Sequence, residues 1–122
     1  MALPVIHRLS TRKVYGQVSN VSSTSTLSMP APIKGIITEV GTMLGAAAST
    51  ADATVTTSIA GTAITGGVIT ITQSGSAAGT TSTATPTAAR RVQENDEIRF
   101  VFSGSGTAGG PVLCWATVRE QE

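Results

Sequence analysis

The segment from Glu97 to Arg119 constrains the fold most, because apolar and polar residues alternate along it and most aromatic residues gather in it. Three of the chain's four aromatic side chains lie there: Phe100, Phe102 and Trp115. Alternation with a period of two residues predicts two β-strands, one either side of a glycine-rich connection over 104–110. We expect these strands to pair with each other and to form the most strongly specified part of the core.

The composition as a whole favours an all-β protein. Ser, Thr and Gly are abundant, while the helix formers Glu, Lys, Gln and Leu are scarce. The β-branched residues Thr, Val and Ile suit the pleated, half-buried surface of a sheet. A length of 122 residues indicates one domain with one modest core. Aromatic residues make up only 3%, so burial against a partner subunit would be an attractive source of extra stability.

Further strands are expected between the chain's turn signals. The clearest candidates span residues 33–44, 53–60, 62–65 and 68–73. A Gly66-Gly67 pair between β-branched runs predicts a tight hairpin turn, and Asn95-Asp96 predicts another turn before the aromatic strand. About seven or eight short strands at spacings of roughly 8 to 12 residues are typical of a β-sandwich or jelly roll.

Residues 1–30 differ from the rest, because basic and large apolar residues are mixed there and are followed by a polar run over 19–26. One interpretation is a poorly ordered terminus with some strand character near Val14 to Val18; the other is an extended arm that becomes ordered only against another subunit. We favour the arm, since so many large apolar side chains are unusual in a solvated segment. Pro30 and Pro32 would close it. The expected domains are therefore an arm over 1–30 and a jelly-roll-like β-sandwich over 31–122.

Several function classes find no support in these residues. A net charge of +1 with 12% charged residues does not predict nucleic-acid binding. The single His7 lies in the expected arm, and Cys114 alternates with apolar neighbours as a small buried residue would. Zinc would need about four ligands, which the chain does not supply at usable spacing. We therefore expect a non-enzymatic protein without catalytic residues, metal or cofactor.

Two other patterns resemble binding sites but have simpler explanations. The stretch 104–109 matches G-x-G-x-x-G, but a strand follows it where a dinucleotide site needs a helix. Glu94, Asp96 and Glu97 could bind Ca²⁺, although a charged turn explains them better, and Arg90-Arg91 would pair with that turn. Residues 1–8 contain no continuous apolar stretch, and no apolar run approaches 18 residues. We expect neither a signal peptide nor a membrane span.

Three segments, 32–37, 51–62 and 92–98, resemble small virion proteins of tailed bacteriophages, notably capsid decoration (cement) proteins with a jelly-roll domain. The resemblance covers roughly residues 32–120 in pattern and composition. Many of those proteins have Gly where this chain has Asn95, a residue that also tolerates positive φ. The resemblance implies a homotrimer, made in the host cytoplasm, that binds the outer capsid surface of the virion and clamps neighbouring major capsid protein subunits together.

With that role, the arm would contact the capsid, and a second group of residues would pack between sheets or subunits. The expected capsid contacts are Val5, Ile6, Arg8, Leu9, Arg12, Lys13 and Tyr15. The expected packing residues are Ile36, Val40, Phe100, Phe102 and Trp115. Two alternatives stay open: a tail, neck or fibre-associated virion component, and a carbohydrate-binding β-sandwich module. A carbohydrate-binding module would need an exposed aromatic platform, for which only Trp115 and Tyr15 are candidates outside the Phe pair.

Overall fold

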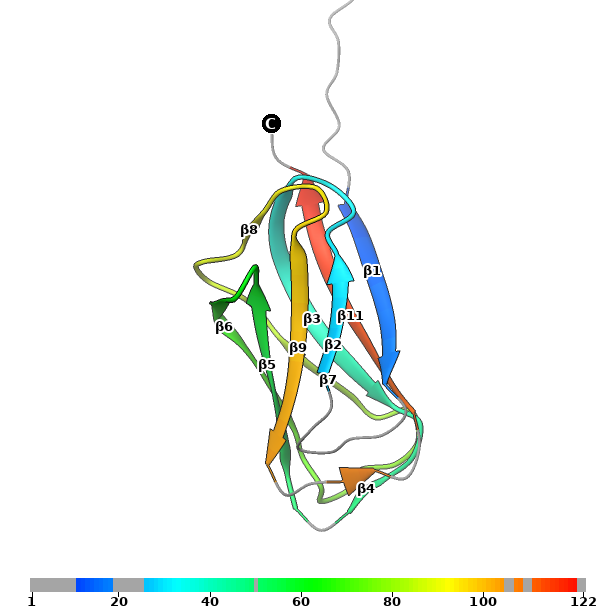
Figure 1. Ribbon diagram of the computed structural model, residues 1–122. Helices are drawn as coiled ribbons and strands as arrows, with labels where there is room; N and C mark the ends of the chain where they lie inside the picture. Colours follow the sequence, from blue (N-terminus) through cyan, green and yellow to red (C-terminus); the bar gives the residue numbers. More distant parts are fainter. Residues whose placement is uncertain (1–10, 19–25, 50, 105–106, 109–110, 121–122) are drawn as a thin grey trace, which may run out of the picture.

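The structure is a computed structural model that describes residues 11–18, 26–49, 51–104, 107–108 and 111–120. Within these residues every regular element is a β-strand, and the strands form two antiparallel sheets packed face to face (Figure 1). The predicted all-β sandwich is confirmed. The β-branched and small residues along the chain explain this outcome, because they fit a pleated sheet on both its buried and its solvated side.

The first sheet, here sheet I, has the strand order β1-β11-β3-β7, and β8 also pairs with β3. Its strands are β1 (Thr11–Val18), β3 (Gly35–Leu44), β7 (Thr81–Ala84), β8 (Arg91–Val92) and β11 (Val112–Glu120). Sheet II has the order β2-β9-β5-β6. Its strands are β2 (Thr26–Pro30), β5 (Ala53–Ile59), β6 (Thr62–Ile71) and β9 (Glu97–Gly104). A small separate pair joins β4 (Ala48–Ser49) to β10 (Thr107–Ala108).

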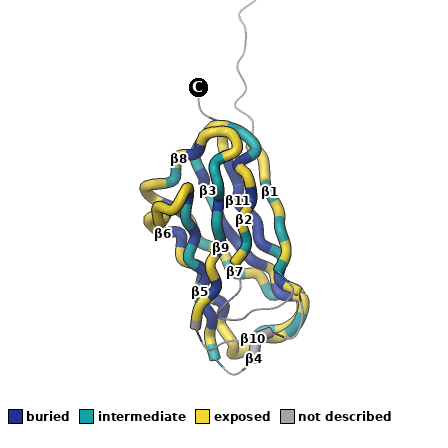
Figure 2. Tube along the Cα trace, viewed as in Figure 1, coloured by how far each residue is buried: buried dark blue, intermediate teal, exposed yellow. Residues whose placement is uncertain are grey.

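The core lies between the two sheets, and buried positions alternate with more exposed ones most clearly along β5 and β9 (Figure 2). The inward residues of β9 and β11 are fully buried, as their alternation predicts. They are Ile98, Phe100 and Phe102 on β9, and Val112, Cys114, Ala116 and Val118 on β11.

The expected pairing of these two strands is wrong. β9 lies between β2 and β5 in sheet II, while β11 lies between β1 and β3 in sheet I. The glycine-rich connection therefore runs from one sheet to the other and contributes β10 on the way. Alternation identifies which face of a strand is buried, but it does not say which strand lies beside it.

The expected boundary between arm and domain also needs correction. β1 pairs with β11 without interruption from Thr11 opposite Arg119 to Val18 opposite Val112, and β2 pairs with β9. Met29 on β2 is only 4% exposed and belongs to the core. Both segments, 11–18 and 26–30, are thus part of the sandwich rather than of an arm over 1–30. Their apolar side chains fill the core of their own chain. Residues 1–10 lie outside the described part of the structure.

The hairpin predicted at Gly66-Gly67 lies elsewhere. β6 continues through these glycines, and the chain turns instead at Ala60 and Gly61, whose φ angles are 48° and 89°. Two successive positive φ angles are the signature of a two-residue hairpin turn. Gly66, with φ of 77°, lies where the register between β5 and β6 shifts, so the Gly-Gly pair belongs to an irregularity within β6 and not to a hairpin turn.

The turn predicted at Asn95-Asp96 is confirmed. Asn95 has a φ of 71°, and Asp96 N donates a hydrogen bond to Gln93 O at 3.1 Å. The Asp96 carboxylate accepts a hydrogen bond from Gln93 N at 2.8 Å, so this side chain closes the turn.

Candidate functional site

One candidate site lies on the outer face of sheet I, around Trp115. Cys114 and Ala116 point into the core, so Trp115 between them points outward. Tyr15 on β1 and Gly41 on β3 are its partners on the two neighbouring strands. Gly41 leaves room for the indole, because a Cβ there would lie 2.5 Å from Trp115 Cε2. The ring therefore lies against the backbone of β3.

Two charged side chains hold the indole in place. Trp115 Nε1 donates a hydrogen bond to Glu39 Oε1 at 3.1 Å, and Lys13 Nζ lies 5.8 Å from the ring centroid. A cation over an indole contributes about 0.5–1 kcal/mol at an exposed site. We call Lys13, Tyr15, Glu39, Met43 and Trp115 the tryptophan patch. Met43 belongs to the patch because it follows the inward-facing Thr42 on β3, so it points to the outer face, where it is 39% exposed.

The tryptophan patch offers less aromatic surface than its residues suggest. Trp115 is only 8% exposed, whereas Tyr15 is 57% exposed. The indole is thus a buried support for this face, and Tyr15 is the aromatic ring that a ligand or partner can reach.

The predicted contact residues are divided by the structure. Arg12, Lys13 and Tyr15 all lie on β1 and are exposed, with Lys13 and Tyr15 beside Trp115. The other predicted contacts, Val5, Ile6, Arg8 and Leu9, lie outside the described residues.

The predicted packing residues occupy three different environments. Val40, Phe100 and Phe102 are fully buried between the sheets. Trp115 lies on the outer face of sheet I, and Ile36 is half-buried on β3, opposite Arg91 of β8. The structure therefore does not gather these five residues into one surface.

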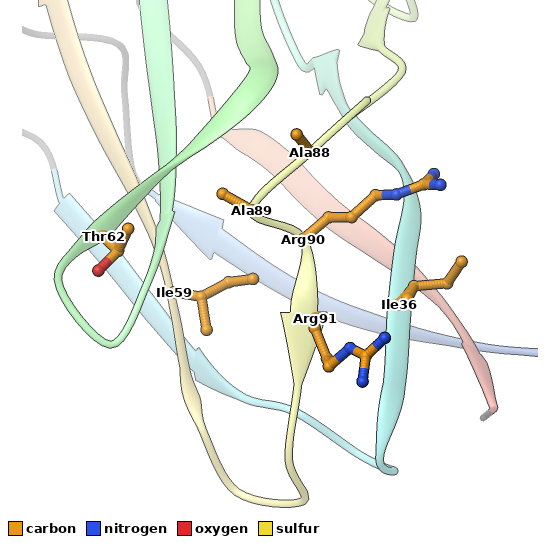
Figure 3. A pocket seen from close by; sticks show the side chains of 7 residues that line it. All are labelled: Ile36, Ile59, Thr62, Ala88, Ala89, Arg90 and Arg91. Atoms are coloured by element: carbon orange, nitrogen blue, oxygen red, sulfur yellow. The ribbon is translucent and has the colours of Figure 1, made fainter. Parts of the chain in front are cut away.

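A second candidate site, which the sequence did not reveal, is a cavity at the edge of the sandwich (Figure 3). We call it the arginine pocket; its volume is about 580 Å³. Its lining residues are Ile36, Ile59, Thr62, Ala88, Ala89, Arg90 and Arg91. In Figure 3 the side chains of Arg90 and Arg91 extend toward β3, while Ile59 and Thr62 lie on the other side of the 88–91 segment.

The arginines of this pocket do not pair with the acidic turn, contrary to expectation. Arg90 Nη1 donates a hydrogen bond to Pro86 O at 3.2 Å. The Arg91 side chain has no hydrogen bond or ion pair with any described residue. Asp96 instead closes its own turn, and Glu97 pairs with Arg99 at 2.9 Å. The adjacent arginines could have indicated a binding site in the sequence. The pocket beside them, however, is formed by segments that are distant in sequence.

The outer face of sheet II is polar and internally paired. Thr54 and Ser103 share a hydrogen bond of 2.6 Å between their hydroxyl oxygens. Hydrogen bonds from Ser28 and Arg99 lower the pKa of the exposed Glu97 carboxyl. Val68 and Val101 are the large apolar side chains exposed on this face, at 52% and 36%.

Reactive and metal-binding groups are sparse in the part of the chain that the structure describes. The described residues hold no group of three His, Cys, Asp or Glu side chains arranged to bind a metal ion. Burial raises the pKa of the Cys114 thiol to about 12, so this thiol stays protonated at neutral pH. A search of the described residues finds no helix long and apolar enough to cross a membrane.

Comparison with known proteins yields structural likeness only. No protein-family model and no curated protein sequence matches the chain. The structure of CsCBM6-3 from Clostridium stercorarium in complex with cellobiose matches with a TM-score of 0.53 and 18% identity, over 87% of this chain and 74% of that one. A chain of the cyanophage Pam1 capsid asymmetric unit matches with a TM-score of 0.54 and 15% identity, over 99% of this chain and 93% of that one. At these identities the shared property is the β-sandwich fold.

Proposed function

We propose that this protein is a non-enzymatic structural component of a phage virion. It binds the outer surface of the capsid as a homotrimer and clamps neighbouring subunits of the major capsid protein. The observation that carries the proposal is the match to the cyanophage capsid chain over 99% of this chain and 93% of that one. The two chains are thus comparable in length as well as fold, whereas the match to the carbohydrate-binding module covers 74% of that chain.

The chemistry of the described residues fits a clamp. A thiol with a pKa near 12 is a poor nucleophile at neutral pH, because the thiolate is the reactive form. The exposed groups of β1 are instead suited to contacts between proteins. A protein that binds only the assembled shell stabilises it by mass action, and many weak contacts add up over the many copies on a head.

We place the capsid contact on β1 and the segment before it. Tyr15 presents an exposed ring, and Arg12 and Lys13 supply positive charge on the same strand. Tyrosine and arginine are enriched at the energetically important positions of protein interfaces. Val5, Ile6, Arg8 and Leu9 complete the proposed contact in the chain before β1.

The direct test is co-sedimentation with undecorated phage heads, after light scattering has measured the oligomeric state. We expect the wild-type trimer to pellet with heads and with no other virion part. Tyr15→Ala should weaken binding without changing the melting temperature. Val68→Ala, an exposed apolar residue on sheet II, serves as the matched control and should bind normally. Deleting residues 1–10 spares every described strand, so it should weaken binding without unfolding the sandwich.

Each outcome has a distinct meaning. A monomeric protein that does not bind to heads would overturn the proposal. Binding to tails or fibres would support the tail, neck or fibre alternative. Unchanged binding after deletion of 1–10 would remove that segment from the contact but leave β1 to be judged by Tyr15→Ala.

Carbohydrate binding is a second candidate, favoured by the fold shared with a module solved in complex with cellobiose. The tryptophan patch supports it weakly, since Tyr15 is exposed but Trp115 is only 8% exposed. Stacking of a sugar on an isolated ring gives little affinity. Calorimetric titration with cellobiose should therefore show no binding; saturable binding that Tyr15→Ala abolishes would favour this candidate over the clamp.

A further inference from the structure

We propose that the arginine pocket binds the carboxylate of an Asp or Glu side chain on a loop of the shell protein, and that Arg91 is the residue that pairs with it. This inference rests on the proposed function, because it names a contact that the clamp makes. It adds a second contact region, at the β8 edge of sheet I, to the one proposed on β1.

The wall of the pocket is fixed by backbone hydrogen bonds before any partner arrives. Thr65 N donates to Ala88 O at 3.1 Å, and Thr87 N donates to Thr65 O at 2.9 Å. On the other side, Ile37 N donates to Arg90 O at 2.9 Å. Between these anchors Ala89 adopts a φ of 52°, a conformation that is unfavourable for a residue with a side chain. The surrounding bonds impose this turn, and the turn brings Arg90 and Arg91 to the pocket.

The two arginines differ in how far they are already engaged. Arg90 is half-buried and donates to Pro86 O, so it is held in position. Arg91 is exposed, and no described acidic residue neutralises it, since Glu97 pairs with Arg99 and Asp96 closes a turn. The pocket thus has one fixed guanidinium and one available guanidinium beside it.

The shape of the pocket favours a protein carboxylate over a free inorganic anion. Ile36, Ile59, Ala88 and Ala89 give the pocket apolar walls, and its volume of about 580 Å³ far exceeds that of one anion. A free phosphate would leave these walls in contact with water. An acidic side chain on a loop with apolar neighbours would cover the walls while its carboxylate meets the planar guanidinium fork of Arg91.

The first experiment measures the affinity of the full-length protein for undecorated heads after single substitutions. Arg91→Gln should weaken binding roughly 10- to 100-fold, the effect of losing one hydrogen-bonded charge contact. Arg91→Lys keeps the charge but loses the fork, so it should fall between Arg91→Gln and wild type. Arg99→Gln is the matched control: this arginine lies on the outer face of sheet II, does not line the pocket, and its loss changes the net charge equally. Equal affinities for wild type and Arg91→Gln would overturn the inference.

The second experiment needs no capsid, so it separates failure of the pocket from failure of the proposed function. The isolated protein is titrated with N-acetylglutamate methylamide, and methyl and arginine signals are followed by NMR. We expect saturable shifts at Ile36, Ile59 and the Arg91 Nε–H group, and their loss in Arg91→Gln. Absence of shifts in the wild type would overturn the site. A stronger response to inorganic phosphate would overturn its assignment to a protein carboxylate.

Discussion

Replacing Gly41 with alanine tests the arrangement around Trp115, because the structure leaves no room for a methyl group there. The new Cβ would lie 2.5 Å from Trp115 Cε2 and 2.9 Å from Cη2. Carbon atoms in contact normally keep about 3.5–4.0 Å apart. The indole must therefore move by about 1 Å, which weakens the hydrogen bond from its Nε1 to Glu39.

The expected cost follows from these contacts. Inserting a methyl group into a packed site costs about 1–3 kcal/mol, and the disturbed hydrogen bond to a carboxylate adds to that figure. Alanine recovers about 0.5–1 kcal/mol relative to glycine in a strand interior. The net loss for Gly41→Ala is about 1–3 kcal/mol, which for a domain of this size lowers the melting temperature by roughly 5–15 °C.

The assay combines thermal unfolding with fluorescence of the chain's single tryptophan. Gly41→Ala should lower the melting temperature and shift the emission to longer wavelength as the indole becomes more exposed. In a Trp115→Val background the obstructing ring is gone, so the same substitution should become neutral or stabilise by up to about 0.5–1 kcal/mol. An unchanged emission and the same destabilisation in both backgrounds would refute the reasoning.

Three smaller predictions concern the core and the turns. Phe100→Ala should lower the free energy of unfolding, measured by urea denaturation, by about 3–5 kcal/mol, because Phe100 is fully buried. The neighbouring Val101 is 36% exposed, so Val101→Ala should lower it much less. Burial raises the pKa of Cys114 from 9.0 to about 12, so the thiol of the unfolded chain ionises at lower pH than that of the folded chain. The contribution of this thiol to the free energy of unfolding is therefore complete below pH 9 and is lost between pH 9 and 12. Cys114→Val should remove this pH-dependent loss of stability. Ala60→Gly should raise the melting temperature, since Ala60 has a φ of 48° beside Gly61 in the β5–β6 turn.

Local alternation was sufficient to identify which face of the aromatic strands is buried. The inward positions of β9 and β11 follow from a period of two, and Trp115 lies on the opposite face from Cys114 for the same reason. Strand partners did not follow, because β9 and β11 occupy different sheets. A pattern within seven residues carries no information about neighbours that are recruited from forty or more residues away.

Two turn assignments show the limit of composition as a signal. Gly66-Gly67 has the residues of a tight turn, yet it lies at a register shift within β6, while the actual hairpin uses Ala60-Gly61. Both residue pairs allow positive φ, so residue type does not determine which of them forms the hairpin turn. The length over which β5 and β6 pair determines it. The turn at Asn95 could be predicted from the sequence, because the Asp96 side chain within the same turn supports the positive φ of Asn95.

The first strand was assigned to the arm for a different reason. Val14, Gly16 and Val18 alternate with exposed residues along β1, but the basic residues at its start and the polar run after it favour an arm over a strand of the sandwich. The arginine pocket could not be predicted from any local sequence pattern. It needs β3, the β5–β6 turn and the 88–91 segment to meet, and those contacts exist only in the folded sandwich.

The two outer faces predict how the protein sits on its partner. On sheet II, Thr54 pairs with Ser103 and Arg99 pairs with Glu97, so little is gained by covering these groups. Sheet I exposes Tyr15 and, at its edge, Arg91, which pairs with none of the described residues, and both gain from burial or pairing at an interface. Sheet I should therefore face the capsid and sheet II the solvent. Hydrogen exchange on decorated heads should slow the exposed amides of β1 and of β8 relative to the isolated protein, while those of β6 on sheet II exchange as before. Slowing confined to β6 would reverse this orientation.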